Sequence, residues 1–148
     1  MKMRILFGLA AMAALTATLF AADVNLSKVK CVVNPKAGAK AEKSADYRGG
    51  HVYFCCDNCK RKFTTDSKPF AVPANAQLVA TKQFKQKACP LSGGKLDPAT
   101  AIEVGGVKVC FCCNNCKGKV AGAEGDAQTA LVFADAAFEK GFAAAKAE

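Results

Sequence analysis

A cysteine-rich motif occurs twice in this chain and constrains the fold more than any other feature. FCCDNCKRKF spans residues 54–63, and FCCNNCKGKV spans residues 111–120. A separate cysteine precedes each motif: Cys31 lies 24 residues before Cys55, and Cys89 lies 23 residues before Cys112. Self-similarity over such a distance indicates duplication of one small structural unit.

Each unit carries the signals of a β-hairpin directly before its cysteine motif. A pair of glycines at 49–50 or 105–106 precedes a short run of β-forming residues at 51–54 or 107–111. Glycines before alternating β-forming residues predict a tight hairpin turn. We therefore expect each motif to begin where the second strand of a hairpin ends.

Two helices are expected after each hairpin, a short polar one and a longer packing helix. Asn75 and Asp126 are favourable N-cap residues for the second helix of each unit. The connector at 65–74 contains two prolines and is the expected irregular segment. The predicted helices span residues 58–63 and 75–84 in the first unit, and residues 115–120 and 126–138 in the second.

The first 22 residues have the pattern of a secretory signal peptide. Lys2 and Arg4 lead into an apolar run over 5–20, which is shorter than the roughly 20 apolar residues of a bilayer-spanning helix. We expect export to the periplasm or medium, with cleavage after Ala21 or Ala22; an uncleaved membrane anchor is the alternative. The predicted organisation is 1–22 signal peptide, 23–87 first unit, and 88–148 second unit with a C-terminal helix.

Charge is distributed unevenly between the two units. Residues 23–88 carry 13 basic and 5 acidic side chains, whereas residues 89–148 carry 6 and 7. A basic half can bind nucleic acid or an anionic surface. An exported protein rarely meets nucleic acid, however, and lysines beside thiolates offset the negative charge of a metal–thiolate cluster. We expect a metal ion and no nucleic acid as partner, with membrane contact only through an uncleaved signal segment.

The cysteine spacing suits a metal site in each unit. Cys55 and Cys59 lie four residues apart and Cys56 and Cys59 three apart, so that all can face one side of a first helical turn. Three or four thiolates suit Zn(II), which is tetrahedral, or Cu(I), which tolerates fewer ligands. The candidate ligands are Cys31, Cys55, Cys56 and Cys59 in the first unit and Cys89, Cys112, Cys113 and Cys116 in the second.

Two other interpretations of these cysteines stay open. Export favours a disulfide-stabilised structural or interaction module, although vicinal cysteines such as Cys55 and Cys56 bridge only with strain. The C-x-x-C sequences at 56–59 and 113–116 are typical of thiol-disulfide redox proteins, although this chain is too short and repetitive for a thioredoxin-like framework. Haem attachment is excluded because lysine follows each C-x-x-C where histidine is required.

The remaining reactive residues do not predict catalysis. Cys110 has no counterpart in the first unit, where Tyr53 holds the matching position, and is expected to be a buried strand residue. His51 is the only histidine and a candidate fourth ligand of the first unit alone, since the second unit has Lys108 there. One histidine allows no Ser/His/Asp set, and neither paired carboxylates nor a glycine-rich phosphate loop stand out. We therefore predict that the chain is not an enzyme.

The first unit, written F-C-x3-C-x3-F over 54–63 with a cysteine upstream, resembles the TRASH and YHS domains, which are related to the MYM-type zinc fingers. The second unit, opening with ACPLSGGKL at 88–96, is similar to the C-P-x-[ST]-G start of exported bacterial YHS-like proteins. The resemblance implies two tandem treble-clef or zinc-ribbon-like units and roles in heavy-metal trafficking, sensing or resistance. The ligands that it implies are Cys31, Cys55, Cys59, Cys89, Cys112 and Cys116.

This chain departs from the family pattern at the fourth ligand. Many relatives open with C-x2-C, whereas Asn34 and Ser92 stand at the second of these positions here. Either Cys56 and Cys113 replace the missing ligand, or each site is three-coordinate and open. Val120 also replaces the closing aromatic residue of the second unit, a change that alters packing only.

The sequence thus predicts a small α+β protein of two units, each a β-hairpin with a cysteine turn and short helices. Its predicted function is to hold Zn, or alternatively Cu, through cysteine thiolates in each repeat of an exported protein, in metal trafficking or resistance. A thiol-disulfide redox protein and a disulfide-stabilised module are the alternatives.

Overall fold

The chain folds as a small α+β protein of two tandem units, as the sequence predicts. The computed structural model describes residues 24–145, so the predicted signal peptide lies outside the described residues. The first unit comprises β1 (Lys40–Tyr47), β2 (Gly50–Phe54), α1 (Asp57–Thr65), the 3-10 helix η1 (Lys68–Phe70), α2 (Ala71–Ala80) and β3 (Phe84–Gln86). The second comprises β4 (Asp97–Val104), β5 (Val107–Phe111), α3 (Asn114–Ala121), α4 (Gly125–Phe133), α5 (Asp135–Gly141) and β6 (Phe142–Ala144). Over residues 24–145, no helix has both the length and the apolar character needed to cross a bilayer.

Both predicted hairpins are present, as the antiparallel pairs β1–β2 and β4–β5. Gly105 and Gly106 form the second turn, with φ of 58° and 79°, as a two-residue hairpin turn requires. In the first unit the corresponding turn residues are Arg48 and Gly49, with φ of 52° and 78°, so the predicted glycine pair is displaced by one residue. Gly50 instead begins β2, where a Cβ atom would lie 2.9 Å from Cδ2 of Leu78, because α2 approaches the strand closely.

The short helices follow the cysteines as predicted, but the packing helices differ from the prediction. Helix α2 begins at Ala71, within the segment that was expected to be irregular. Pro73 lies in the first turn of this helix, where its missing N–H group costs nothing because the N–H groups of a first turn have no partner inside the helix. Asn75 is therefore buried inside the helix and is not its N-cap. The predicted helix over 126–138 is broken at Ala134, and Glu124 precedes α4 as its N-cap in place of Asp126.

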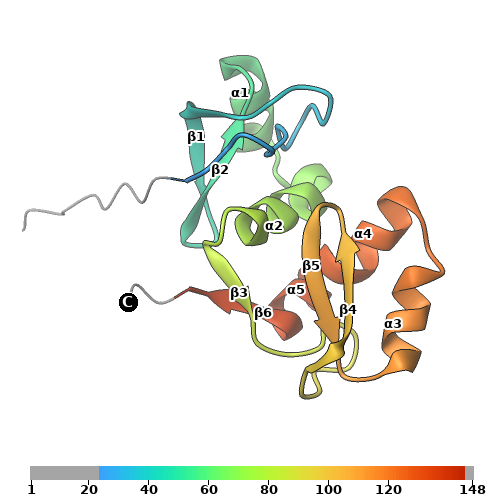
Figure 1. Cartoon of the computed structure of the whole chain (residues 1–148). Coiled ribbons are helices and arrows are strands. Elements are labelled where there is room, and N and C mark those ends of the chain that lie inside the picture. The colour runs from blue at the N-terminus through green and yellow to red at the C-terminus, as the bar shows by residue number, and fades with distance from the viewer. Residues whose placement is uncertain (1–23, 146–148) are drawn as a thin grey trace, which may run out of the picture.

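The two units share one hydrophobic core. Helix α2 crosses the middle of the molecule and packs against α4, while β3 pairs with β6 in a short antiparallel sheet (Figure 1). The ring of Phe84 in β3 lies 5.1 Å from that of Phe138 in α5, and Phe138 stacks on Phe142 of β6 at 5.3 Å. The buried residues come from both units, so their union supplies a larger core than a unit of about 60 residues builds by itself.

Glutamine side chains complete the exposed edges of both hairpins. Gln77 accepts a hydrogen bond from the backbone N–H of Tyr53 at 2.6 Å and donates to its carbonyl at 3.0 Å. Gln86 of the first unit makes the same two bonds with Cys110 of the second, at 2.9 and 2.7 Å. Each amide group thus takes the place of a third strand and satisfies backbone groups that a two-stranded hairpin leaves open.

Polar contacts at α5 also connect the units. Arg48, in the turn of the first hairpin, lies 2.8 Å from Asp135 and 3.0 Å from Glu139. The Nδ2 group of Asn75 donates to the backbone carbonyl of Phe133 at 2.8 Å and to Asp135 at 2.9 Å. Asn75 therefore bridges the end of α4 and the start of α5, where the predicted long helix is interrupted.

Replacing Asn75 by alanine is expected to lower the free energy of unfolding by about 1–3 kcal/mol, because the buried carbonyl of Phe133 loses its donor. Urea denaturation followed by circular dichroism measures this change. Asn115→Ala, at an exposed position in the first turn of α3, is the matched control and is expected to change stability little. An Asn75→Ala protein as stable as the parent would contradict the assigned role.

Candidate metal centres

Three cysteines of the first unit converge at the junction between its hairpin and α1. Cys31 lies in the loop before β1, Cys55 directly follows β2, and Cys59 lies in the first turn of α1. Their Sγ atoms all lie within 4.8 Å of one another, and those of Cys55 and Cys59 are 3.6 Å apart. Cys31 and Cys59 are buried, and Cys55 is half-buried.

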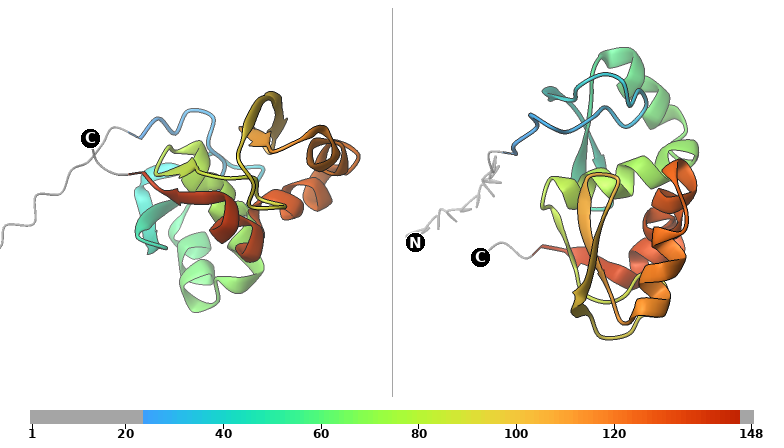
Figure 2. Two further views of the ribbon diagram at one scale, coloured as in Figure 1. Left: turned by 90° about the horizontal axis from the view of Figure 1, so that it is seen from below. Right: turned by 45° about the vertical axis from the view of Figure 1, so that its right-hand side comes forward.

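The second unit repeats this arrangement. The Sγ atoms of Cys89, Cys112 and Cys116 lie within 4.8 Å of one another, with 3.7 Å between the last two. Cys89 is buried, whereas Cys112 and Cys116 are half-buried. We call these clusters triad one and triad two. Helices α1 and α3, which carry one cysteine of each triad, lie toward opposite ends of the molecule (Figure 2).

Local backbone structure explains why the sulfur atoms meet. The strand before each motif ends at a fully buried phenylalanine, Phe54 or Phe111, which anchors the next residue at the edge of the core. The helix starts two residues after Cys55 or Cys112, so the cysteine one turn further on turns back toward the strand end.

The upstream cysteine of each triad lies in a compact turn. The backbone N–H of Cys31 donates to the carbonyl of Ala37 at 2.9 Å. That of Cys89 donates to Gly94 at 2.9 Å, while the carbonyl of Cys89 accepts from the N–H of Gly93 at 2.7 Å. Gly93 has φ of 76°, which favours glycine at this position. These turns hold the third sulfur opposite the strand–helix junction.

The donor set and its spacing fit a metal ion. Thiolates that bind one tetrahedral zinc ion at about 2.3 Å lie about 3.8 Å from one another. The Sγ atoms of Cys55 and Cys59, at 3.6 Å, and those of Cys112 and Cys116, at 3.7 Å, match this spacing. All nine cysteines lie within the described residues, and all are free thiols. Each triad could therefore hold a thiophilic ion with three sulfur ligands and leave a fourth coordination position.

Cys56 and Cys113, the second cysteines of the doubled pairs, occupy a different position from the triads. Each is the exposed N-cap residue of its helix. The Sγ atom of Cys56 lies 3.8 Å from that of Cys55, and the Sγ atom of Cys113 lies 3.7 Å from that of Cys112. Neither residue belongs to a triad, because a triad contains only cysteines whose Sγ atoms all lie within 4.8 Å of one another. Their predicted role as fourth ligands stays a prediction.

Ionisation differs among the thiols of a triad. Burial alone would raise the pKa of Cys31, but hydrogen bonds from backbone N–H groups outweigh burial and lower it. Burial opposes the ionisation of Cys89 as well, but the Ser92 hydroxyl and backbone N–H groups lower the pKa of Cys89 to about 6. Desolvation and the neighbouring thiols raise the pKa of Cys59 and of Cys116 to about 12. Cys31 and Cys89 therefore ionise more readily than Cys59 and Cys116. A bound cation favours ionisation of all three.

The residues three positions after Cys31 and Cys89 differ between the units. The Ser92 hydroxyl accepts the N–H of Gly94 at 3.1 Å and lies 3.1 Å from Sγ of Cys112. The side chain of Asn34 instead accepts the N–H of Lys36 at 3.2 Å, and only its backbone N–H reaches Sγ of Cys31, at 3.4 Å. A side-chain hydroxyl thus contacts a sulfur atom of triad two, whereas only a backbone N–H makes such a contact in triad one. The contact of Ser92 was not predicted from the sequence.

Cys110 and His51 belong to neither triad. Cys110 is half-buried in β5, so the expectation of a fully buried strand residue holds only in part. His51 is exposed, and its Nδ1 lies 2.8 Å from a carboxylate oxygen of Asp46, on the other strand of the hairpin. The structure therefore does not bring His51 to the sulfur atoms of triad one.

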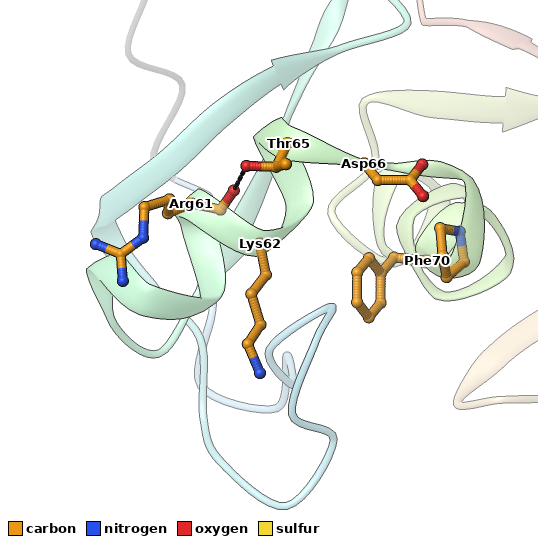
Figure 3. A pocket seen from close by; sticks show the side chains of 6 residues that line it. Arg61, Lys62, Thr65, Asp66 and Phe70 are labelled. Carbon is orange, nitrogen blue, oxygen red and sulfur yellow. Dashed lines mark hydrogen bonds between the residues drawn. The ribbon is translucent and has the colours of Figure 1, made fainter.

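A shallow hollow of about 360 Å³ lies beside the C-terminal half of α1 (Figure 3). No cysteine contributes to it, and the hydroxyl of Thr65 in its wall donates to the carbonyl of Arg61 at 2.9 Å. Its lining residues are Arg61, Lys62, Thr65, Asp66, Pro69 and Phe70. The triads are thus the groups in the described structure that best support a chemical function.

Comparison of the chain with protein-family models, with curated proteins and with solved structures finds no match. The resemblance to TRASH and YHS domains therefore rests on the cysteine motifs alone. The site is accordingly defined by its own geometry, which is that of two triads of cysteine sulfur atoms.

In reduced, metal-free protein, the ultraviolet absorbance of thiolates is expected to include an ionisation near pH 6 that belongs to Cys89. Ser92→Ala removes a hydroxyl that favours the thiolate, so this step is expected to move to higher pH. Asn34→Ala is the matched control and leaves the step in place. An unchanged titration curve for Ser92→Ala would contradict the effect of the Ser92 hydroxyl on the pKa of Cys89.

Proposed function

We propose that this chain is an exported, non-enzymatic metal-binding protein that holds one soft or borderline ion in each unit, Zn(II) or Cu(I), for metal trafficking or resistance. The observation that carries the proposal is the presence of two triads, each built from the same three positions of the repeat. The signal-like segment at 1–22 and the resemblance to TRASH and YHS domains support export and a role in metal handling.

The chemistry of the triads favours thiophilic ions over the hard cations. Each offers sulfur alone, and the groups whose donor atoms converge contain no carboxylate. Thiolate ligands select Zn, Cu(I) and similar ions, whereas Mg²⁺ and Ca²⁺ require oxygen ligands. Three sulfur atoms suit Cu(I) without a further ligand, whereas Zn(II) completes its tetrahedron with a fourth.

Lysines near the triads are consistent with an anionic metal–thiolate centre. Three thiolates around Cu(I) or Zn(II) carry a net negative charge. Lys60 follows Cys59 directly and Lys117 follows Cys116, and both are half-buried. Positive side chains at these positions offset part of that charge without binding the ion.

Protein prepared under reducing conditions is expected to bind about two equivalents of Zn(II) or Cu(I), one for each triad. Cys31→Ser and Cys89→Ser are each expected to lose one equivalent, because each removes a buried ligand from one triad. Elemental analysis after gel filtration measures the stoichiometry, and Cys110→Ser is the control that keeps both ions. A chelator is expected to lower the thermal unfolding temperature of the loaded protein.

Two results would contradict the proposal. One is a protein that stays metal-free when it is offered both ions under these conditions. The other is a folded protein, isolated from the exported fraction, in which eight cysteines are oxidised to disulfides. The second result would favour the disulfide-stabilised module.

A further inference from the structure

An additional thiol stands at the same place beside each triad. Cys56 and Cys113 have nearly identical extended backbones, with φ and ψ of −159° and 166° in one and −165° and 167° in the other. Both are exposed, and each lies within 3.8 Å of a triad sulfur atom, as the distances above show. The two units differ at many other positions, so this agreement indicates a common use of the two residues.

These thiols are the most accessible sulfur atoms of their sites. In triad one, Cys31 and Cys59 are only 2% and 8% exposed, and Cys55 is half-buried, with its Sγ atom 3.6 Å from that of Cys59 and 3.8 Å from that of Cys56. A metal ion that is bound to a carrier can therefore reach Cys56 without any rearrangement of the core. From Cys56, the ion needs to move only to the adjacent sulfur of Cys55 to begin joining the triad.

Soft ions pass between thiolate complexes by associative exchange, in which the incoming sulfur binds before the outgoing sulfur leaves. At Cys56, a metal–sulfur bond forms and one bond from the ion to the carrier then breaks, while the proton of the Cys56 thiol passes to the departing carrier thiolate. In the delivery step, a bond from the ion to the Cys55 sulfur forms and the bond to the Cys56 sulfur then breaks. The proton of the Cys55 thiol passes to the Cys56 sulfur, and any other triad thiol that binds the ion releases its proton to solvent. The ion keeps its oxidation state throughout, so the step requires neither an oxidant nor a reductant.

We propose that Cys56 and Cys113 are exchange thiols: each receives a metal ion from an external thiolate carrier and delivers it to the triad behind it, without remaining as a fourth ligand. This inference rests on the proposed metal-binding function. Cu(I) bound to a small anionic thiol such as glutathione is the carrier that the site fits best. Basic residues follow both exchange thiols, at Lys60 and Arg61 in α1 and at Lys117 and Lys119 in α3.

The test compares equilibrium affinity with transfer rate in the full chain. The variant is the double substitution Cys56→Ser and Cys113→Ser, and the probe is Cu(I)–glutathione. Competition with a chromophoric Cu(I) chelator measures affinity, and stopped-flow absorbance measures the rate of loading. We expect an affinity within about twofold of the parent and a loading rate lower by about tenfold or more, because the triads are intact but their accessible thiols are gone. Each single substitution is expected to slow the loading of one site only.

Cys110→Ser is the matched control, because it removes a half-buried cysteine that belongs to neither triad. Its affinity and loading rate are expected to equal those of the parent. A large loss of affinity in the double variant would show that Cys56 and Cys113 are resident ligands and would overturn the proposal. An unchanged loading rate would also overturn the proposal, because it would show that Cys56 and Cys113 take no part in metal transfer. A failure of the proposed function itself appears separately, as a parent protein that binds no ion.

Discussion

The convergence of three sulfur atoms at a strand–helix junction is the constraint on which this structure depends. A buried phenylalanine ends the strand, a helix begins two residues after the first cysteine of the motif, and the cysteine one turn later faces back toward the strand end. The upstream turn then brings in the third sulfur. This arrangement requires backbone geometry that is correct to about an ångström. Rigid hairpins and helices supply it, and the rest of the fold holds those elements in place.

The core that holds these elements in place is shared between the two units. The β3–β6 sheet, the phenylalanines around Phe138 and the packing of α2 on α4 combine the two units into one domain. Gln86 supports Cys110 in the other unit, so the strand that leads to triad two depends directly on a residue of the first unit. The shared core thus joins the two units, while helices α1 and α3 lie toward opposite ends of the molecule (Figure 2).

Duplication has not left the two sites identical. The Ser92 hydroxyl faces the sulfur atoms of triad two, whereas the Asn34 side chain turns toward its own loop. Cys116 is also more exposed than Cys59. Hydrogen bonds to ligand sulfur atoms and the exposure of a site both tune metal affinity, so the two triads offer different environments within one chain. The doubled cysteine, by contrast, is placed alike in both units.

The sequence by itself determined the duplication, both hairpins and the short helices after the cysteines, because these depend on local turn chemistry and on spacing within one or two helical turns. Its spacing offered eight candidate sulfur atoms, of which the structure brings six together in two triads. The tertiary structure decided where contacts are distant in sequence. Alanines at 134 and 136–137 give no local signal to stop a helix, and the helix is interrupted where Asn75 of the other unit binds the carbonyl of Phe133 and the carboxylate of Asp135. Sequence spacing also could not predict that Cys56 and Cys113 lie outside the triads. Spacing shows which thiols can reach a site, but only the packed backbone decides which sulfur atoms converge.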